Sequence, residues 1–166
     1  MNAENNKKLK NAVLSLLIYY VGRACRSCYK YDETLAATFG ALPDGFVFRI
    51  GALPAGAGLT IRKDADGITV LDRSDAHASP DLDIRFKNVG TAKMFFNGSK
   101  SLAACFSQSQ TVTEGDTSHI MTLSRIFDAV ASYILTKGIL KRNGRELLPR
   151  RVSAHKMRFK TLIGRI

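Results

Sequence analysis

Two cysteines separated by two residues are the first side chains whose spacing could do chemistry. Cys25 and Cys28 have the Cys-x-x-Cys spacing of zinc sites and redox-active thiols. A structural zinc needs four ligands, and the other candidate ligands are scattered along the chain: Cys105, His77, His119 and His155. A thioredoxin-like site needs a βαβ context, whereas this pair follows a helical segment. We therefore expect reduced, inert thiols near a helix end, with no metal and no cofactor.

No other arrangement in the sequence matches a catalytic site. Asp116 and His119 lie one helical turn apart, which capping of a helix explains better than a catalytic pair does. Gly51, Gly56 and Gly58 precede a strand, whereas a phosphate-binding loop opens a helix. The sequence contains no Gly-x-Ser-x-Gly elbow, and its Ser-x-x-Lys candidates have no companion motif. We therefore predict a protein that binds rather than catalyses.

A helix is predicted at the amino terminus. Its apolar residues recur at helical spacing and predict an amphipathic helix docked on the body: Leu9, Val13, Leu16, Leu17 and Tyr20. Lysines precede this run, as in a signal peptide, but the residues after it lack the small-x-small cleavage pattern, so a targeting signal stays an alternative. The apolar run 12–21 is shorter than the roughly 18–20 residues that span a bilayer.

Four segments with strand-like patterns follow: 46–50, 59–63, 68–72 and 82–86. Residues 64–67 predict a short turn between the second and third segments, and 74–81 predict a polar loop. The alternation predicts a four-stranded meander with one buried face, on which Asp81 and Asp83 point outward. A short fifth strand is predicted at 111–113.

Helical segments surround that fifth strand. Two short helices within 89–109 carry Met94, Phe95, Phe96 and Phe106. After a cap at Asp116, Thr117 or Ser118, a longer helix carries an apolar stripe: Ile120, Leu123, Phe127, Val130 and Ile134, broadened by Met121, Ile126 and Leu135. This order predicts an α+β fold in which helices cover one face of a sheet. On residue type alone, these apolar side chains form a plain core more readily than a ligand cavity.

The net charge of +11 is concentrated at the two ends of the chain. Residues 1–30 carry +5 and residues 137–166 carry +9, whereas residues 31–136 carry −3. Basic ends suit attraction to anionic lipid headgroups. A fold that binds nucleic acid more often spreads its cations over one folded face.

The last segment predicts a basic helix with an apolar stripe. Phe159, Leu162, Ile163 and Ile166 have helical spacing. The predicted contacts to a membrane or another anion are Lys156, Arg158, Lys160 and Arg165. Such a helix lies in a membrane interface or in a partner's groove, or it packs back on its own domain. Binding of nucleic acid or the ribosome through this tail, and protein interaction through it, are the alternative functions.

The order of the segments from about residue 46 to 135 resembles the sterol carrier protein two domain, a family of small lipid-binding proteins. The resemblance rests on the hairpin 59–72, the Pro-Asp-Leu-Asp-Ile-Arg-Phe strand at 80–86, the Asn-Gly-Ser-Lys at 97–100, and the run from Ala103 to Asp116 before a long helix. It departs at the inserted Ser99 and at the polar residues 108–110. The resemblance implies a five-stranded, mainly antiparallel sheet with helices on one face and no catalysis of its own.

A tunnel for a lipid, fatty acyl or isoprenoid chain is also implied by the resemblance. Its lining would come from Phe95, Phe96, Phe106, Ile120, Leu123, Ile126, Phe127 and Val130. The expected organisation is an amino-terminal helical region (1–40), a lipid-binding domain (41–140) and a basic tail (141–166). The expected partners are an apolar ligand, an anionic membrane surface and a protein of lipid or quinone metabolism. The odd number of cysteines favours a reducing, cytoplasmic location.

Overall fold

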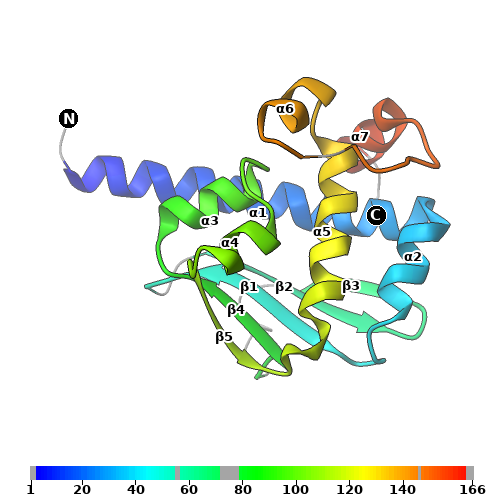
Figure 1. Cartoon of the computed structure of the whole chain (residues 1–166), viewed down its shortest axis with the longest axis horizontal. Helices are drawn as coiled ribbons and strands as arrows, with labels where there is room; N and C mark the ends of the chain where they lie inside the picture. The colour runs from blue at the N-terminus through cyan, green and yellow to red at the C-terminus, as the bar shows by residue number, and fades with distance from the viewer. Residues whose placement is uncertain (1–2, 55–56, 72–78, 146, 164–166) are drawn as a thin grey trace.

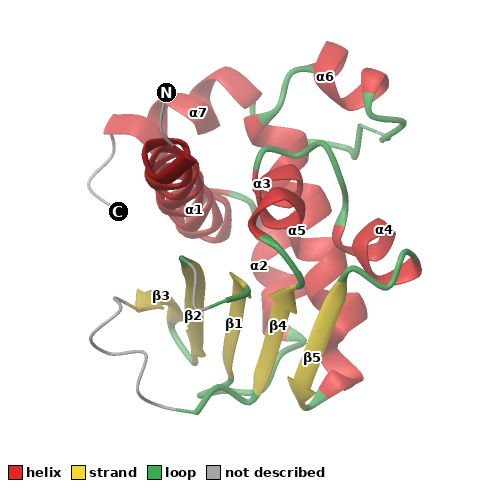
Figure 2. Cartoon of the chain, turned by 90° about the vertical axis from the view of Figure 1, so that its left-hand side faces the viewer, coloured by secondary structure: helices red, strands yellow, loops and turns green. Residues whose placement is uncertain are grey.

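The computed structural model describes residues 3–54, 57–71, 79–145 and 147–163. Its strands form one sheet, and the described helices lie on one face of it (Figure 2). The strands are β1 (Val47–Ala52), β2 (Gly58–Asp64), β3 (Gly67–Leu71), β4 (Leu82–Phe86) and β5 (Thr111–Gly115). The helices are α1 (Ala3–Tyr31), α2 (Glu33–Gly40), α3 (Val89–Phe96), α4 (Leu102–Ser107), the 3₁₀ turn η1 (Thr117–His119), α5 (Ile120–Ile134), α6 (Lys137–Arg142) and α7 (Ala154–Ile163).

The described strands form a five-stranded sheet in the order β3-β2-β1-β4-β5. The predicted hairpin is confirmed, because β2 pairs antiparallel with β3, and β1 also pairs antiparallel with β2. The predicted four-stranded meander is wrong at its last step. β4 lies parallel to β1, with Ile50 opposite Ile84, and antiparallel to β5. Alternation of apolar and polar residues identifies a strand and its buried face but not the strand beside it. It could therefore not predict that β4 pairs with the edge of β1 opposite β2. The predicted polar loop 74–81 lies mostly outside the described residues.

The predicted outward position of Asp83 needs a correction. Its side chain leaves the helix-covered face as expected, but the residue is only 3% exposed. The Asp83 carboxylate pairs with the Arg49 guanidinium, and it lies 3.3 Å from Nε of Arg85. Paired arginines on neighbouring strand positions therefore allow a buried charge on this face.

Polar side chains fix where the helices begin. Oδ1 of Asp32 accepts a hydrogen bond from the Thr34 amide at 2.9 Å and starts α2. Asn88, Ser101 and Thr136 cap α3, α4 and α6 in the same way. Asp116 was predicted to cap the long helix, but it caps the 3₁₀ turn η1: its carboxylate accepts from the Ser118 amide at 3.0 Å, and α5 begins after His119 without a side-chain cap.

Helix α1 runs over β2 and β3 and belongs to the core (Figure 1). Its buried stripe consists of Leu14, Ile18, Val21, Cys25 and Cys28. The predicted docking face is therefore wrong in part, because Leu9 and Leu16 are 59% and 68% exposed. The sequence is apolar around more than one side of this helix, and only the contact with the sheet decides which side is buried.

The predicted apolar stripe of α5 is confirmed at its centre, where Leu123, Phe127 and Val130 are buried. Met121 is 63% exposed, so its predicted part in the stripe is wrong. One hydrophobic cluster joins α1, the sheet, α3, α4, α5 and Met157 of α7. Within the described residues, no helix combines the length and apolarity that crossing a membrane requires.

Candidate functional site

The eight side chains predicted to line a tunnel come together on the helix-covered side of the sheet. Phe95, Phe96, Leu123, Ile126, Phe127 and Val130 are buried, and Phe106 and Ile120 are half-buried. Their helices, α3, α4 and α5, stand over β1, β4 and β5 (Figure 2). Four of the eight, Phe95, Phe96, Phe127 and Val130, line one small cavity there.

That region is packed rather than hollow. The ring of Phe127 lies 5.2 Å from that of Phe95 and 6.3 Å from that of Phe48, both in edge-to-face geometry. Phe95 also contacts Phe96 and Phe86, with ring centroids 5.0 and 5.1 Å apart. The cavity left beside them is about 20 Å³, which is room for about one water molecule. An acyl chain does not fit there in this conformation.

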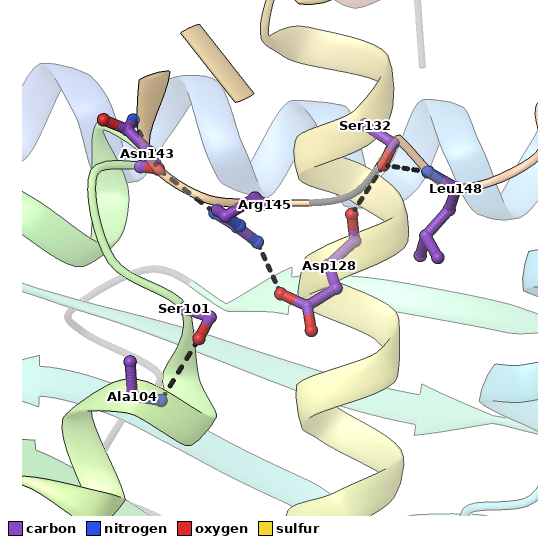
Figure 3. A network of polar contacts seen from close by, with 8 residues as sticks. Ser101, Ala104, Asp128, Ser132, Asn143, Arg145 and Leu148 are labelled. Carbon is purple, nitrogen blue, oxygen red and sulfur yellow. Dashed lines mark hydrogen bonds and ion pairs between the residues drawn. The ribbon is translucent and has the colours of Figure 1, made fainter. Parts of the chain in front are cut away.

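A polar network lies beside this small cavity (Figure 3). Arg145, which follows α6, pairs with the Asp128 carboxylate on α5 and donates from Nη1 to the Gly98 carbonyl oxygen at 3.2 Å. Nδ2 of Asn143 donates to the same oxygen, also at 3.2 Å. Gly98 and Arg145 both line the cavity. The segment after α6 is thereby fastened across the space between α3 and α5.

A larger open groove lies on the other side of α1, and sequence reasoning missed it. Its volume is about 340 Å³, and it runs between α1 and strands β2 and β3. Ile18, Ala57, Leu59, Val70 and Leu71 supply its apolar lining. Gly22 brings α1 close to the sheet here, since a β-carbon at Gly22 would lie 2.9 Å from Cδ1 of Leu59. The groove joins segments about forty residues apart in sequence, which no local pattern predicts.

The wall that α1 contributes is polar and cationic. Ser15, Tyr19, Arg23 and Arg26 line the groove from this helix. They are spaced four, four and three residues apart, so they form one stripe of the helix. This spacing is visible in the sequence. The prediction followed the apolar residues of the helix instead, and these indicated a different face for contact with the rest of the protein.

The three cysteine thiols lie in the core. Cys25, Cys28 and Cys105 are free and fully buried. Burial raises the pKa of the Cys25 thiol to about 12 and raises that of Cys28 further, where Cys25 and Asp32 add to the effect of burial. Such thiols carry no thiolate near neutral pH. Among the described residues no three His, Cys, Asp or Glu side chains gather as metal ligands.

His119 and Asp116 are a structural pair. Nε2 of His119 lies 3.6 Å from Oδ2 of Asp116, and its ring packs edge-to-face on Phe46 at 4.9 Å. Hydrogen bonds from Ser118 lower the pKa of the Asp116 carboxyl group. Capping of η1 thus accounts for Asp116, and the contacts with Asp116 and Phe46 account for the position of His119.

The basic tail packs back on the body through one face of α7. Ala154, Met157 and Thr161 are buried, and the Thr161 carbonyl oxygen accepts a hydrogen bond from Nε of Arg23 at 2.7 Å. The buried Tyr133 hydroxyl donates to Oδ2 of Asp32 at 2.6 Å and accepts from the Arg151 amide, which fixes the segment before α7.

The predicted membrane contacts on α7 have different environments. Lys156 is exposed, and Nζ of Lys160 lies 5.4 Å from the ring centroid of Tyr31. Arg158 donates to the carbonyl oxygens of Tyr133 and Leu135 at 3.1 and 2.7 Å. Its guanidinium therefore caps the end of α5, a position that does not suit contact with an external anion. Arg165 lies outside the described residues.

No protein-family model and no curated protein matches this chain. Solved structures do match. A structure called "UbiJ-SCP2 Ubiquinone synthesis protein" is 13% identical, with a TM-score of 0.47, over 75% of this chain and 97% of that one. Apo sterol carrier protein 2 from Yarrowia lipolytica is 13% identical, with a TM-score of 0.47, over 69% and 89%.

The sterol carrier protein domain 2 of Helicoverpa armigera also matches, at 17% identity and a TM-score of 0.46, over 70% of this chain and 89% of that one. These proteins are of the family that the sequence resembles. At these identities and scores the likeness is one of fold and says nothing of a ligand.

Proposed function

We propose that this chain binds an apolar molecule, such as a lipid, without catalysing a reaction, and takes it up in the groove between α1 and strands β2 and β3. The observation that carries the proposal is the free volume of the groove, about 340 Å³, against about 20 Å³ in the cavity beside Phe95 and Phe127. Small-molecule sites usually have about 300–1,000 Å³ and a mostly apolar lining. The groove meets the volume condition, and apolar side chains supply about half of its lining.

Four of the residues predicted to line a tunnel, Phe95, Phe96, Phe127 and Val130, would form the inner end of the same proposed site. Ile18 lines the groove and Val21 lines the interior cavity, so α1 separates the two spaces. Movement of α1 away from the sheet would join them and let a longer chain reach Phe95 and Phe127. A short chain needs the groove alone.

The groups that could react support binding over chemistry. Cys25 and Cys28 are buried and protonated at neutral pH, and neither lines the groove. His119 is held by Asp116 and Phe46. A ligand in the groove would meet apolar side chains, hydroxyl groups and guanidinium groups, which are suited to holding it.

We propose that the ligand reaches the groove from a membrane to which the protein attaches. Phe159, Leu162 and Ile163 of α7 are 60%, 65% and 68% exposed, beside the exposed Lys156. Apolar side chains flanked by basic ones are typical of helices that lie in a membrane interface. A role beside quinone synthesis, with a protein partner in that process, is part of the same proposal and is supported by the sequence resemblance.

The test is titration of the delipidated, ¹⁵N-labelled chain with decanol, followed by amide chemical shifts. We expect saturable shifts at groove residues such as Ile18, Leu59 and Val70. Val70→Phe should weaken binding by about tenfold or more, because the added ring occupies the volume of the ligand chain.

Thr69→Phe is the matched control, since neighbouring strand residues face opposite sides of the sheet. It should leave the affinity for decanol unchanged. Melting temperatures of both variants separate lost binding from lost folding. Absence of saturable shifts in the wild-type chain, or equal binding by Val70→Phe and wild type, would contradict the proposal.

A further inference from the structure

The groove is amphipathic, with its cations on one wall and its apolar surface on the other. Strands β2 and β3 contribute Leu59, Val70 and Leu71, whereas α1 contributes Arg23 and Arg26. Figure 2, which looks along α1, shows this helix directly above the edge of the sheet that β2 and β3 form. A molecule lying in the groove would therefore meet apolar side chains along its length and guanidinium groups at its side.

The two arginines have different surroundings. Arg23 is held in place, since its Nε donates to the Thr161 carbonyl oxygen at 2.7 Å and its Nη1 donates to the Tyr19 hydroxyl at 3.3 Å. Arg26 is half-buried, and no carboxylate of the described residues lies within ion-pair distance of it. A half-buried guanidinium without a counter-ion attracts an oxyanion more strongly than a fully solvated one does.

We propose that the groove selects a single-chain amphiphile with an oxyanion head, a carboxylate or a phosphate. Its chain lies on Ile18, Leu59 and Val70, and its head lies at Arg26, with Arg23 at the next turn of the helix. The planar guanidinium fork matches both oxyanions. This inference rests on the proposed function and adds the ligand class.

The volume suits a ligand with one chain. About 340 Å³ is at the lower end of the range for small-molecule sites, about 300–1,000 Å³. A phospholipid with two acyl chains needs more room than this groove offers, whereas a ten-carbon chain with a compact head suits it.

The experiment compares four probes on the whole chain: decanoate, decyl phosphate, decanol and inorganic phosphate. The two anionic amphiphiles should bind about tenfold or more tightly than decanol, since a charge-assisted hydrogen bond strengthens binding by about that factor. Inorganic phosphate alone should not produce saturable shifts at Leu59 and Val70. Arg26→Gln should remove the preference for the anions, so that this variant binds decanoate no more tightly than decanol.

Arg142→Gln is the matched control, because it removes the same charge from an exposed position on α6, which does not line the groove. It should leave all affinities unchanged. Equal binding of decanol and decanoate by wild type, or equal loss in Arg26→Gln and Arg142→Gln, would overturn the head-group proposal while the proposed function stands. Binding of inorganic phosphate with no binding of any ten-carbon probe would overturn both.

Discussion

Cysteine and arginine side chains on α1 lie a few residues apart and have opposite environments. Cys25 and Cys28 face the core and are fully buried, whereas Arg23 and Arg26 line the groove. The Cys-x-x-Cys spacing that first indicates metal or redox chemistry is here the spacing of two core residues one helical turn apart. Because these thiols are buried, the free energy of unfolding should depend on pH.

We predict that the chain loses stability between about pH 9 and pH 12. The unfolded Cys25 thiol ionises near its ordinary value of 9.0, whereas burial raises its pKa to about 12 in the folded protein. The folded state thus keeps a proton that the unfolded state has lost, so the free energy of unfolding falls by about 1.4 kcal/mol per pH unit for each such thiol. Urea denaturation at several pH values measures this slope.

Cys25→Ala gives the control for that slope. Removing one thiol should make the fall of stability with pH shallower, even though the smaller side chain also lowers stability at pH 7. Tyr20 and Tyr133, whose pKa values are also raised, keep part of the slope in the variant. Identical slopes in wild type and Cys25→Ala would show that the thiol is ionised to the same extent in both states.

The burial of single residues was predictable where the sequence pattern gives an element only one apolar face. The α5 stripe around Phe127 and the β4 alternation at Leu82 and Ile84 correctly predicted buried side chains. Asp83 was not predictable as a buried residue, because its partner Arg49 lies on a strand brought beside it by the parallel β1–β4 pairing. The groove arginines escaped prediction for the same reason, since their apolar neighbours come from β2 and β3.

At the scale of elements, α1 shows where sequence patterns fail. Two stripes along it have equally good helical spacing, one through Leu9 and Leu16 and one through Leu14 and Ile18. The second is buried. What decides between them is the fit of α1 on the sheet at Gly22, opposite Leu59 and Val70. A tertiary contact of this kind leaves no periodic trace in the sequence.

Gly22→Ala should lower the free energy of unfolding by up to about 2 kcal/mol, because the usual cost of about 1–3 kcal/mol for an added methyl group in a packed site outweighs the helix preference for alanine. The new β-carbon would lie 2.9 Å from Cδ1 of the buried Leu59. Chemical denaturation measures the change, and amide exchange along α1 reports whether the helix lifts from the sheet.

Gly138→Ala is the matched control for this contact. A β-carbon at Gly138, on α6, would meet nothing within 4 Å. There the usual helix preference for alanine should raise stability by about 0.5–1 kcal/mol. Equal stabilisation in both variants would contradict the close seating of α1 at Gly22.

At the scale of the whole molecule, the fold places the basic helix α7 against the carboxy-terminal half of α1 (Figure 1). Residues 1–30 carry +5 and residues 137–166 carry +9. Helices α1 and α7 contact each other on the side of the molecule away from the sheet (Figure 1). The sequence showed both charges and left open whether the tail packs back. The packing of Met157 and Thr161 places α7 on α1 and leaves its other side exposed.

This arrangement predicts attachment to anionic membranes through α7. The chain should co-sediment with vesicles of phosphatidylglycerol and phosphatidylcholine more strongly than with phosphatidylcholine alone, because each basic residue near an anionic surface adds about 1 kcal/mol. Raising the salt concentration should weaken that difference. Replacing Phe159, Leu162 and Ile163 together by Ser should reduce binding by about tenfold or more.

The matched control for the triple variant is Met121→Ser, which alters an apolar side chain that is 63% exposed on α5. It should bind vesicles as wild type does, because Met121 lies away from α7. Equal binding to neutral and anionic vesicles, or none to either, would exclude the basic surface as a membrane contact. Salt-sensitive binding to RNA in place of vesicles would instead favour nucleic acid as the partner of the tail, since phosphate contacts alone produce that dependence without any need for the apolar side chains of α7.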